Sequence, residues 1–216
     1  MPYPFCSDID LLHWEPAIFR DAAFVSQTLL SADNASLSGT TLTLPGGLVG
    51  DEAEIASASV AYIGGSVDGC FPIASIDSPT QLTISVLYDA LFDNPSVPSR
   101  PGPDLTGLPL TLRTFWPQRK VVSDLLLQML NLAPTQPEAV LNPDALRRPC
   151  TLGTLHMIYS ALAATSEQAS AHAVRADLYE RLYRRSLRAA RVELDLNGDG
   201  EPDCRRNLAT PALVRE

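Results

Sequence analysis

The chain has 216 residues, enough for one sizeable domain or two small ones, and its 45% hydrophobic and 19% charged residues exclude a disordered protein. The net charge of −9 is unevenly placed. Residues 1–114 hold thirteen Asp/Glu against three Arg, a net −10, whereas residues 115–216 hold thirteen Arg/Lys against twelve Asp/Glu, a net +1. Such an acidic half argues against a duplex-DNA binder, whose folded body normally presents a basic face.

The four cysteines, Cys6, Cys70, Cys150 and Cys204, are widely scattered, with no CxxC pair and no His at zinc-finger spacing. This excludes a zinc finger and a dense disulfide scaffold, so thiols in a reducing cytoplasm are expected. The opening MPYPFCSDID lacks the basic and apolar regions of a secretory signal, and no apolar run approaches a membrane span. We therefore expect a soluble protein that stays where it is made and has no membrane partner.

Residues 1–34 are predicted to form the first helix of a bundle, with the helical pattern over roughly residues 8–31. Glu15 and Pro16 suit the first turn of a helix. Apolar residues then recur at three- and four-residue spacing, which places them on one helix face: Ile18, Ala22, Val25 and Leu29. Ser31 and the Asp33-Asn34 pair mark its expected end.

Residues 35–116 change to short strand-like runs, among them SVAYI, FPIASI, QLTISVL and LPLTLRTFW. Turn signals separate the runs at Gly64-Gly65, Asp68-Gly69 and Ser78-Pro79. Short strands spaced about 8–14 residues apart favour an antiparallel β-rich barrel or sandwich. We expect this region to be a domain inserted between the first and second helices of the bundle.

Residues 117–194 return to helical spacing and are predicted to form the bundle core. Three helices are expected, with Thr151 as the N-cap of the second and Ser166 as the N-cap of the third. In the third, small and aromatic residues form one stripe beside an arginine-rich flank: Ala169, Ala173, Ala176, Tyr179, Tyr183, Leu187 and Ala190. This pattern fits an oligomerising helix and a surface helix of a monomer equally well. The expected fold class is α+β, a bundle of about four helices with the inserted β-rich domain.

Residues 195–204 form an acidic loop, DLNGDGEPDC, that matches the opening of an EF-hand calcium loop. The candidate calcium ligands are alternate residues: Asp195, Asn197, Asp199, Glu201 and Asp203. Position twelve of such a loop, which normally supplies a bidentate Glu, is Arg206 here, and this excludes a standard EF-hand. Two interpretations stay open, a weaker calcium site and a plain polar turn. No other cofactor is indicated.

No catalytic set emerges from the sequence, so the chain is not expected to be an enzyme. GxSxG, HExxH, GxxxxGK[ST] and GxGxxG patterns are all lacking. A hydrolase built from scattered residues, such as His13 with Asp8 and Asp10, has no nucleophile–base spacing to support it.

Three segments, SDIDLLHWEPAIFRDA, LRRPCTLGTLHMIYSAL and LYERLYRRSLRAARVELDLNGDGEPD, resemble the head–tail adaptor (connector) proteins of tailed bacteriophages and phage-like particles. The resemblance covers the helical regions only. It implies a structural virion protein that assembles into a homo-oligomeric ring, typically a dodecamer, beneath the portal. The ring would link the capsid to a tail-side neck or tail terminator protein, with DNA passing through it without specific binding. The implied location is the neck of the virion, with assembly in the host cytoplasm.

Residues 205–216 match the C-terminal arm that docks into the portal in this family. The residues expected to contact a partner are Arg205, Arg206, Leu208, Pro211, Leu213 and Val214. A short apolar segment interrupted by Pro211 suits ordering on a partner's surface, although a frayed terminus is the simpler interpretation. The alternative function for the whole chain is a calcium-dependent protein-binding module without catalytic activity.

Overall fold

The computed structural model describes residues 3–47, 60–84, 104–165 and 169–208. The chain divides into two units. The barrel unit is Asp8–Phe115, and the helical unit combines Met1–Ser7 with Trp116–Glu216. The fold class is therefore α+β, as predicted, with a closed antiparallel barrel between two parts of the helical unit in the sequence.

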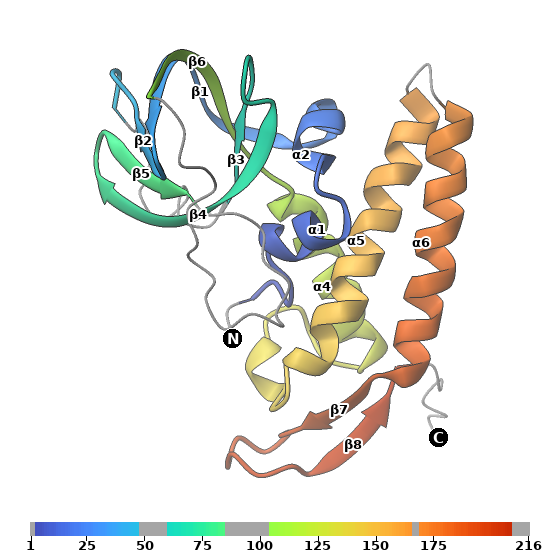
Figure 1. The fold of residues 1–216 in the computed structure, drawn as a ribbon. Coiled ribbons are helices and arrows are strands. Elements are labelled where there is room, and N and C mark those ends of the chain that lie inside the picture. Colours follow the sequence, from blue (N-terminus) through green and yellow to red (C-terminus); the bar gives the residue numbers. More distant parts are fainter. Residues whose placement is uncertain (1–2, 48–59, 85–103, 166–168, 209–216) are drawn as a thin grey trace. The chain divides into compact units, whose positions relative to one another are not determined.

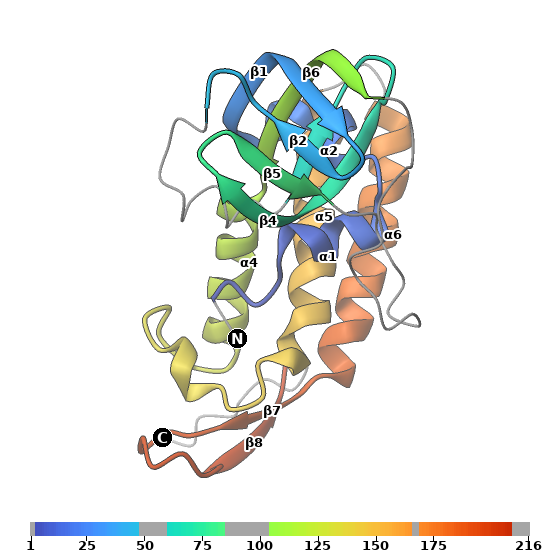
Figure 2. The same ribbon diagram turned by 60° about the vertical axis from the view of Figure 1, so that its left-hand side comes forward.

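The barrel unit begins with two short helices, α1 (Asp8–Trp14) and α2 (Ile18–Asp21), and the 3-10 turn η1 (Ala23–Val25). In the described residues of the unit six strands follow: β1 (Gln27–Ser38), β2 (Thr41–Thr43), β3 (Val60–Ile63), β4 (Gly69–Ser78), β5 (Gln81–Ile84) and β6 (Leu105–Thr114). They close into an antiparallel barrel in the order β1-β2-β5-β4-β3-β6, with β6 returning to pair with β1 (Figure 2).

The interior of the barrel is filled by side chains. Strand residues alternate between the two faces, and the inward set forms one core: Ala35, Leu37, Leu42, Leu44, Ala61, Ile63, Leu82, Ile84, Leu108, Leu110 and Leu112. A six-stranded barrel is narrow enough for aliphatic side chains to occupy its centre. The barrel is therefore a packed core rather than a container for a ligand.

The predicted helix over residues 8–31 is wrong in its second half. Helix α2 ends at Asp21, and residues from Gln27 onward belong to β1, where Gln27 pairs with Thr114 and Leu30 with Leu112. Closing the barrel requires a long first strand, and this tertiary pairing overrides the helical spacing of Val25 and Leu29.

Asp8 ties the start of α1 to the end of β6. Its buried carboxylate accepts hydrogen bonds from Thr114 Oγ1 at 2.6 Å and from the backbone N–H of Phe115 at 3.1 Å. Arg113 adds a bond from Nη1 to the carbonyl of Phe19 at 2.7 Å, and the Phe19 and Phe115 rings lie 5.0 Å apart. A buried carboxylate needs such donors, so Asp8 has a structural role here.

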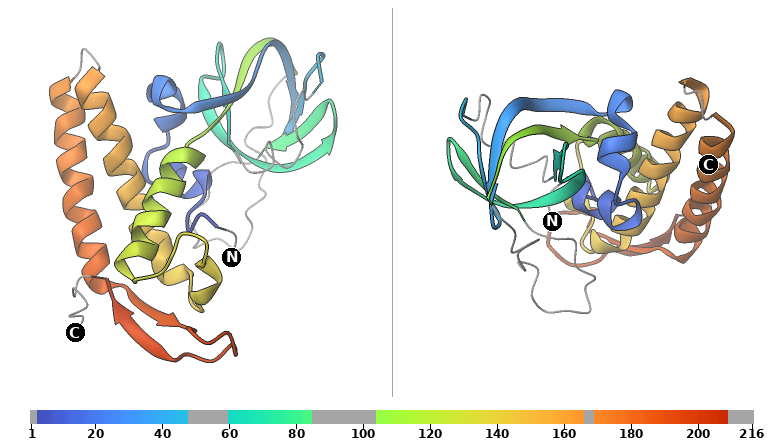
Figure 3. Two further views of the ribbon diagram at one scale, coloured as in Figure 1. Left: turned by 180° about the vertical axis from the view of Figure 1, so that it is seen from behind. Right: turned by 45° about the horizontal axis from the view of Figure 1, so that its top comes forward.

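The helical unit contains α4 (Trp116–Met129), the 3-10 turn η2 (Pro137–Ala139), α5 (Asp144–Thr165) and α6 (Ala169–Ala189). It ends in a hairpin of β7 (Arg191–Leu194) and β8 (Cys204–Asn207) (Figure 1). Helix α5 packs against both α4 and α6 (Figure 3, left). None of the helices in the described ranges is long and apolar enough to cross a membrane.

Gly153 sets the closest approach of these three helices. A Cβ at this position would lie 2.8 Å from Val122 Cγ1 of α4 and 3.0 Å from Tyr183 Cε2 of α6. Further along α5, the rings of Tyr159 and Tyr179 stack at 5.6 Å between α5 and α6. Side chains of α4 and α6 therefore both reach α5 at Gly153.

Two predicted details of these helices are corrected by the structure. Thr151 lies inside α5, where its hydroxyl donates to the carbonyl of Arg147 at 2.9 Å, so it is not an N-cap. The helix predicted to continue to residue 194 ends at Ala189, and Arg191–Leu194 form a strand. The predicted cap Ser166 lies outside the described residues.

Candidate interaction site at the C-terminal hairpin

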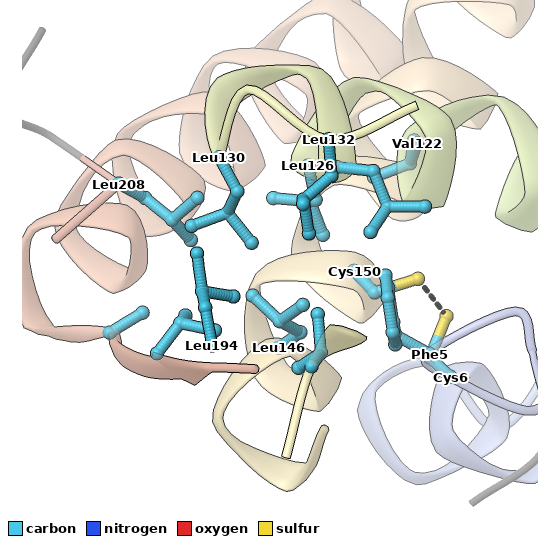
Figure 4. Close-up of a cluster of buried hydrophobic side chains, with 14 residues drawn as sticks. Phe5, Cys6, Val122, Leu126, Leu130, Leu132, Leu146, Cys150, Leu194 and Leu208 are labelled. Atoms are coloured by element: carbon cyan, nitrogen blue, oxygen red, sulfur yellow. Dashed lines mark hydrogen bonds between the residues drawn. The ribbon is translucent and has the colours of Figure 1, made fainter. Parts of the chain in front are cut away.

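The C-terminal hairpin is an integral part of the helical unit's core. In β7, Val192 and Leu194 point inward and are fully buried, while Arg191 and Glu193 face outward. Leu194 packs with Leu130, Leu146 and Leu208 in the cluster shown in Figure 4. The alternation of apolar and charged residues thus explains why RVEL forms a strand at the end of an arginine-rich helix.

The segment after η2 forms a third edge beside β7. Val140 bridges Leu194, and the N–H of Leu141 donates to the carbonyl of Glu193 at 3.0 Å. Asn142 makes two further hydrogen bonds. Its Nδ2 donates to the carbonyl of Arg191, and the N–H of Glu193 donates to Asn142 Oδ1. The hairpin is consequently held to the helical unit along its backbone as well as by its side chains.

Strand β8 caps the two helices that end beside it. Arg206 Nη1 donates to the carbonyl of Leu130, immediately after α4, and Asn207 Nδ2 donates to the carbonyl of Arg188 in the last turn of α6 at 3.0 Å. The last carbonyls of a helix lack partners within it, so side-chain donors stabilise these ends. Arg205 pairs across the hairpin with Glu193 at 2.7 Å, and three quarters of its side chain remains exposed.

The predicted docking residues that the structure describes therefore do not belong to an extended arm over residues 205–216. Arg205 and Arg206 belong to β8, and Leu208 is only 8% exposed in the unit's own core. Of this set, Arg205 is the residue that offers an exposed charge. Pro211, Leu213 and Val214 lie outside the described residues.

The acidic loop connects β7 to β8 and is closed by its own hydrogen bonds. Asp195 accepts from the backbone N–H groups of Gly198 at 2.6 Å and Gly200 at 2.8 Å. Asp203 accepts from the N–H groups of Leu196 and Asn197. Both glycines have a positive φ, 81° at Gly198 and 85° at Gly200, a conformation that other residues rarely adopt.

These bonds involve every carboxylate oxygen of the three aspartates. Asp199 accepts from the N–H of Glu201 at 2.8 Å and from Asn197 Nδ2 at 3.0 Å, and Asn197 Nδ2 also donates to Asp203 Oδ1 at 3.1 Å. The bonds from Gly200 and the neighbouring amides hold the pKa of Asp195 below its ordinary value, although partial burial opposes this shift. The loop is thus a polar turn whose charges are stabilised by its own amides.

No group of three or more His, Cys, Asp or Glu side chains in the described part of the chain is arranged to hold a metal ion. The residues that could contribute oxygen atoms are the predicted set, with Glu201 offering its backbone carbonyl. The geometry favours the turn, and calcium binding stays a hypothesis for titration.

Two exposed apolar stripes in the helical unit were not anticipated. On α4, Val121, Leu125 and Met129 recur every four residues and are 41–47% exposed, while on α6 Val174 and Leu178 are 68% and 44% exposed. The signal was present in KVVSDLLLQML, which is apolar on more than one helix face. A helix with a second apolar face leaves hydrophobic surface that the core of its own unit does not cover.

Asp8, Asp10 and His13, the residues of the scattered hydrolase alternative, all lie on α1. Asp8 uses both carboxylate oxygens in the bonds to β6, so it is not poised as a base.

A scan against protein-family models and searches of curated proteins and of solved structures found no match to this chain.

Proposed function

We propose that this protein is a structural assembly subunit, a head–tail adaptor that forms a homo-oligomeric ring beneath a portal and joins capsid to tail around the DNA channel. The observation that carries the proposal is the pair of exposed apolar stripes on α4 and α6. In this reading the helices of the helical unit are the adaptor bundle, and the barrel is its inserted domain.

The two stripes favour a ring because they differ from one another. The α4 stripe has three residues and the α6 stripe two, and they lie on two different helices that both pack against α5. When one face of a subunit meets a different face of its neighbour, the contact is heterologous, and it closes into a ring if the rotation permits. A symmetric dimer would instead need one self-complementary face.

Charge supports the same arrangement. The exposed side of α6 carries Arg181, Arg184, Arg185 and Arg188, whereas residues 1–114 carry a net −10. Arg184 pairs with Glu180 at 2.5 Å, and the other three guanidinium groups have no ion pair with the residues that the structure describes, so they are suited to meet acidic residues of a neighbour. Arginine suits such contacts because its planar group makes paired bonds to carboxylates. The acidic half would also keep passing DNA from adhering.

The proposal is tested by light scattering and negative-stain imaging over a concentration series, with the protein alone and with a candidate portal protein. We expect rings, or a monomer that assembles into rings on the portal. Leu125→Glu should abolish assembly, because it places a charge in the α4 stripe. Ser160→Glu is the control, since Ser160 is an exposed polar residue of α5 and belongs to neither stripe. A wild-type chain that stays monomeric under every condition would overturn the proposal.

A further inference from the structure

Residues 3–7 form an N-terminal strap that lies on α4 of the helical unit. The N–H of Phe5 donates to Ser123 Oγ at 3.1 Å, and Arg119 Nη1 donates to the carbonyl of Cys6 at 2.8 Å. Tyr3 reaches Asp124 through its hydroxyl and packs edge-to-face on Phe5. Phe5 and Cys6 are 3% and 4% exposed, so the strap is part of the core.

The strap brings two cysteines that are 144 positions apart into contact. Cys6 Sγ lies 2.7 Å from Cys150 Sγ of α5, and the contact is buried among Phe5, Val122 and Leu126 (Figure 4). This separation is about 0.7 Å longer than the ~2.05 Å of a disulfide bond. All four cysteines lie in the described residues, and none of them is in a disulfide.

The surroundings of Cys150 favour its thiolate. Burial opposes ionisation, but hydrogen bonds from Cys6 and Ser123 and the positive charge of Arg119 outweigh it, and the pKa of Cys150 lies below its ordinary value. The Ser123 hydroxyl is 3.3 Å from Cys150 Sγ. By contrast, burial raises the pKa of the Cys70 thiol in the barrel unit to about 11, which keeps it protonated at neutral pH.

We propose that Cys6 and Cys150 are a latent cross-link: when the protein meets a peroxide, they form an intramolecular disulfide that fastens the strap to α5. The Cys150 thiolate attacks one oxygen of hydrogen peroxide, giving a sulfenic acid and releasing hydroxide. The Cys6 sulfur then attacks the sulfenic sulfur and displaces its oxygen, which leaves as water with the Cys6 proton. The proton that Cys150 released on ionising joins the hydroxide to form the second water. Two thiols are oxidised, and one peroxide is reduced to two waters.

The cross-link matters because the strap is covalently joined to the rest of the helical unit only through the barrel unit. A bond between residues 6 and 150 would close a loop that contains the whole of Asp8–Phe115. Closing a long loop restricts the unfolded chain more than closing a short one, so the stabilisation should be large. The inference stands independently of the adaptor proposal.

The test uses the full chain with Cys70→Ser and Cys204→Ser, which leaves only the pair. The protein is treated with hydrogen peroxide, quenched with catalase, and digested with trypsin without reductant. We expect residues 1–20 linked to residues 148–175, a product lost on reduction, and a Tm raised by about 5–10 °C until reductant is added. Adding Cys6→Ser to this background should remove both effects.

Two thiols that can still be alkylated after peroxide treatment, or sulfinic acid at Cys150 without the linked peptide, would overturn the inference. A disulfide between two chains would do the same, and so would the linked peptide without a rise in Tm. Since the decisive variant retains both cysteines, a folding defect of the Cys6→Ser control would not affect the result.

Discussion

Replacing Gly153 with alanine tests the packing on which the helical unit depends. In an ordinary helix this change stabilises the protein by up to about 1 kcal/mol, because alanine restricts the unfolded backbone and favours the helix. Here the new Cβ would lie 2.8 Å from Val122 Cγ1 and 3.0 Å from Tyr183 Cε2. Carbon atoms pack at about 3.5–4.0 Å, so α4 and α6 would have to move apart by roughly 0.5–1 Å.

Overpacking of this kind costs about 1–3 kcal/mol, which exceeds the helix-propensity gain. We therefore expect Gly153→Ala to destabilise the helical unit by about 1–2 kcal/mol, and Gly153→Leu by more than about 3 kcal/mol. Urea unfolding followed by circular dichroism measures both values. Ser160→Ala is the matched control, since Ser160 is exposed on the same helix and its replacement should change stability by less than about 0.5 kcal/mol.

A Gly153→Ala protein that is more stable than the wild type would refute the reasoning. It would mean that the three helices are not held at this distance, and that the glycine is there for another reason. Separating α4 from α6 should also disturb the two stripes, so the same variant is expected to weaken any assembly of the wild-type chain.

Further predictions concern the barrel and the hairpin. Thr114→Val removes a donor to the buried carboxylate of Asp8 and should cost about 1.5–3 kcal/mol in urea unfolding; an unchanged midpoint would contradict that role. Leu194→Ala should cost about 2–5 kcal/mol, against almost nothing for Leu196→Ala, whose side chain is 53% exposed. Because the pKa of Asp195 is lowered in the folded protein, its ionised carboxylate stabilises the fold above about pH 4. This contribution is lost as the pH falls through the pKa of Asp195 in the folded protein. Asp195→Asn should therefore reduce the difference in stability between pH 7 and pH 3. An unchanged difference would count against the stabilising role of the Asp195 carboxylate. Calcium or EDTA should leave the Tm unchanged if the loop is held by its own amides, whereas a saturating rise with calcium would establish the ion-binding alternative.

Local patterns were sufficient for much of the fold. Gly64-Gly65 and Asp68-Gly69 correctly separated β3 from β4, and helical spacing located α4, α5 and α6, although α5 begins at Asp144, before its predicted cap Thr151. The apolar residues of the helices recur at three- and four-residue spacing, which is visible in a short window. The same reasoning failed at Gln27–Leu30, where an apparent helix face is a strand, because barrel closure is a long-range requirement.

The same difference between local and long-range contacts applies to the candidate sites. The turn at residues 195–203 could be read from its glycines and aspartates, because its bonds are local. The strand identity of Arg205 and the contact between Cys6 and Cys150 could not, since both depend on which distant segments the topology brings together. Sequence alone therefore located the loop but misplaced the residues that follow it.

The size of the two stripes indicates how the proposed ring would form. Burying an aliphatic side chain contributes about 1.5–3 kcal/mol, and these five residues are roughly half exposed, so one α4–α6 contact would gain about 4–7 kcal/mol. Association costs about 4–15 kcal/mol in lost freedom of motion, so a single contact is weak. In a closed ring each subunit makes two contacts, and the last contact forms within an already assembled chain, so it costs no further loss of translational freedom. Assembly should therefore be sharply cooperative or depend on a template such as the portal, with monomers and complete rings populated and few species between them. A series of stable dimers and trimers would show that the contact is stronger than these side chains can supply, and would point to an interface elsewhere on the chain.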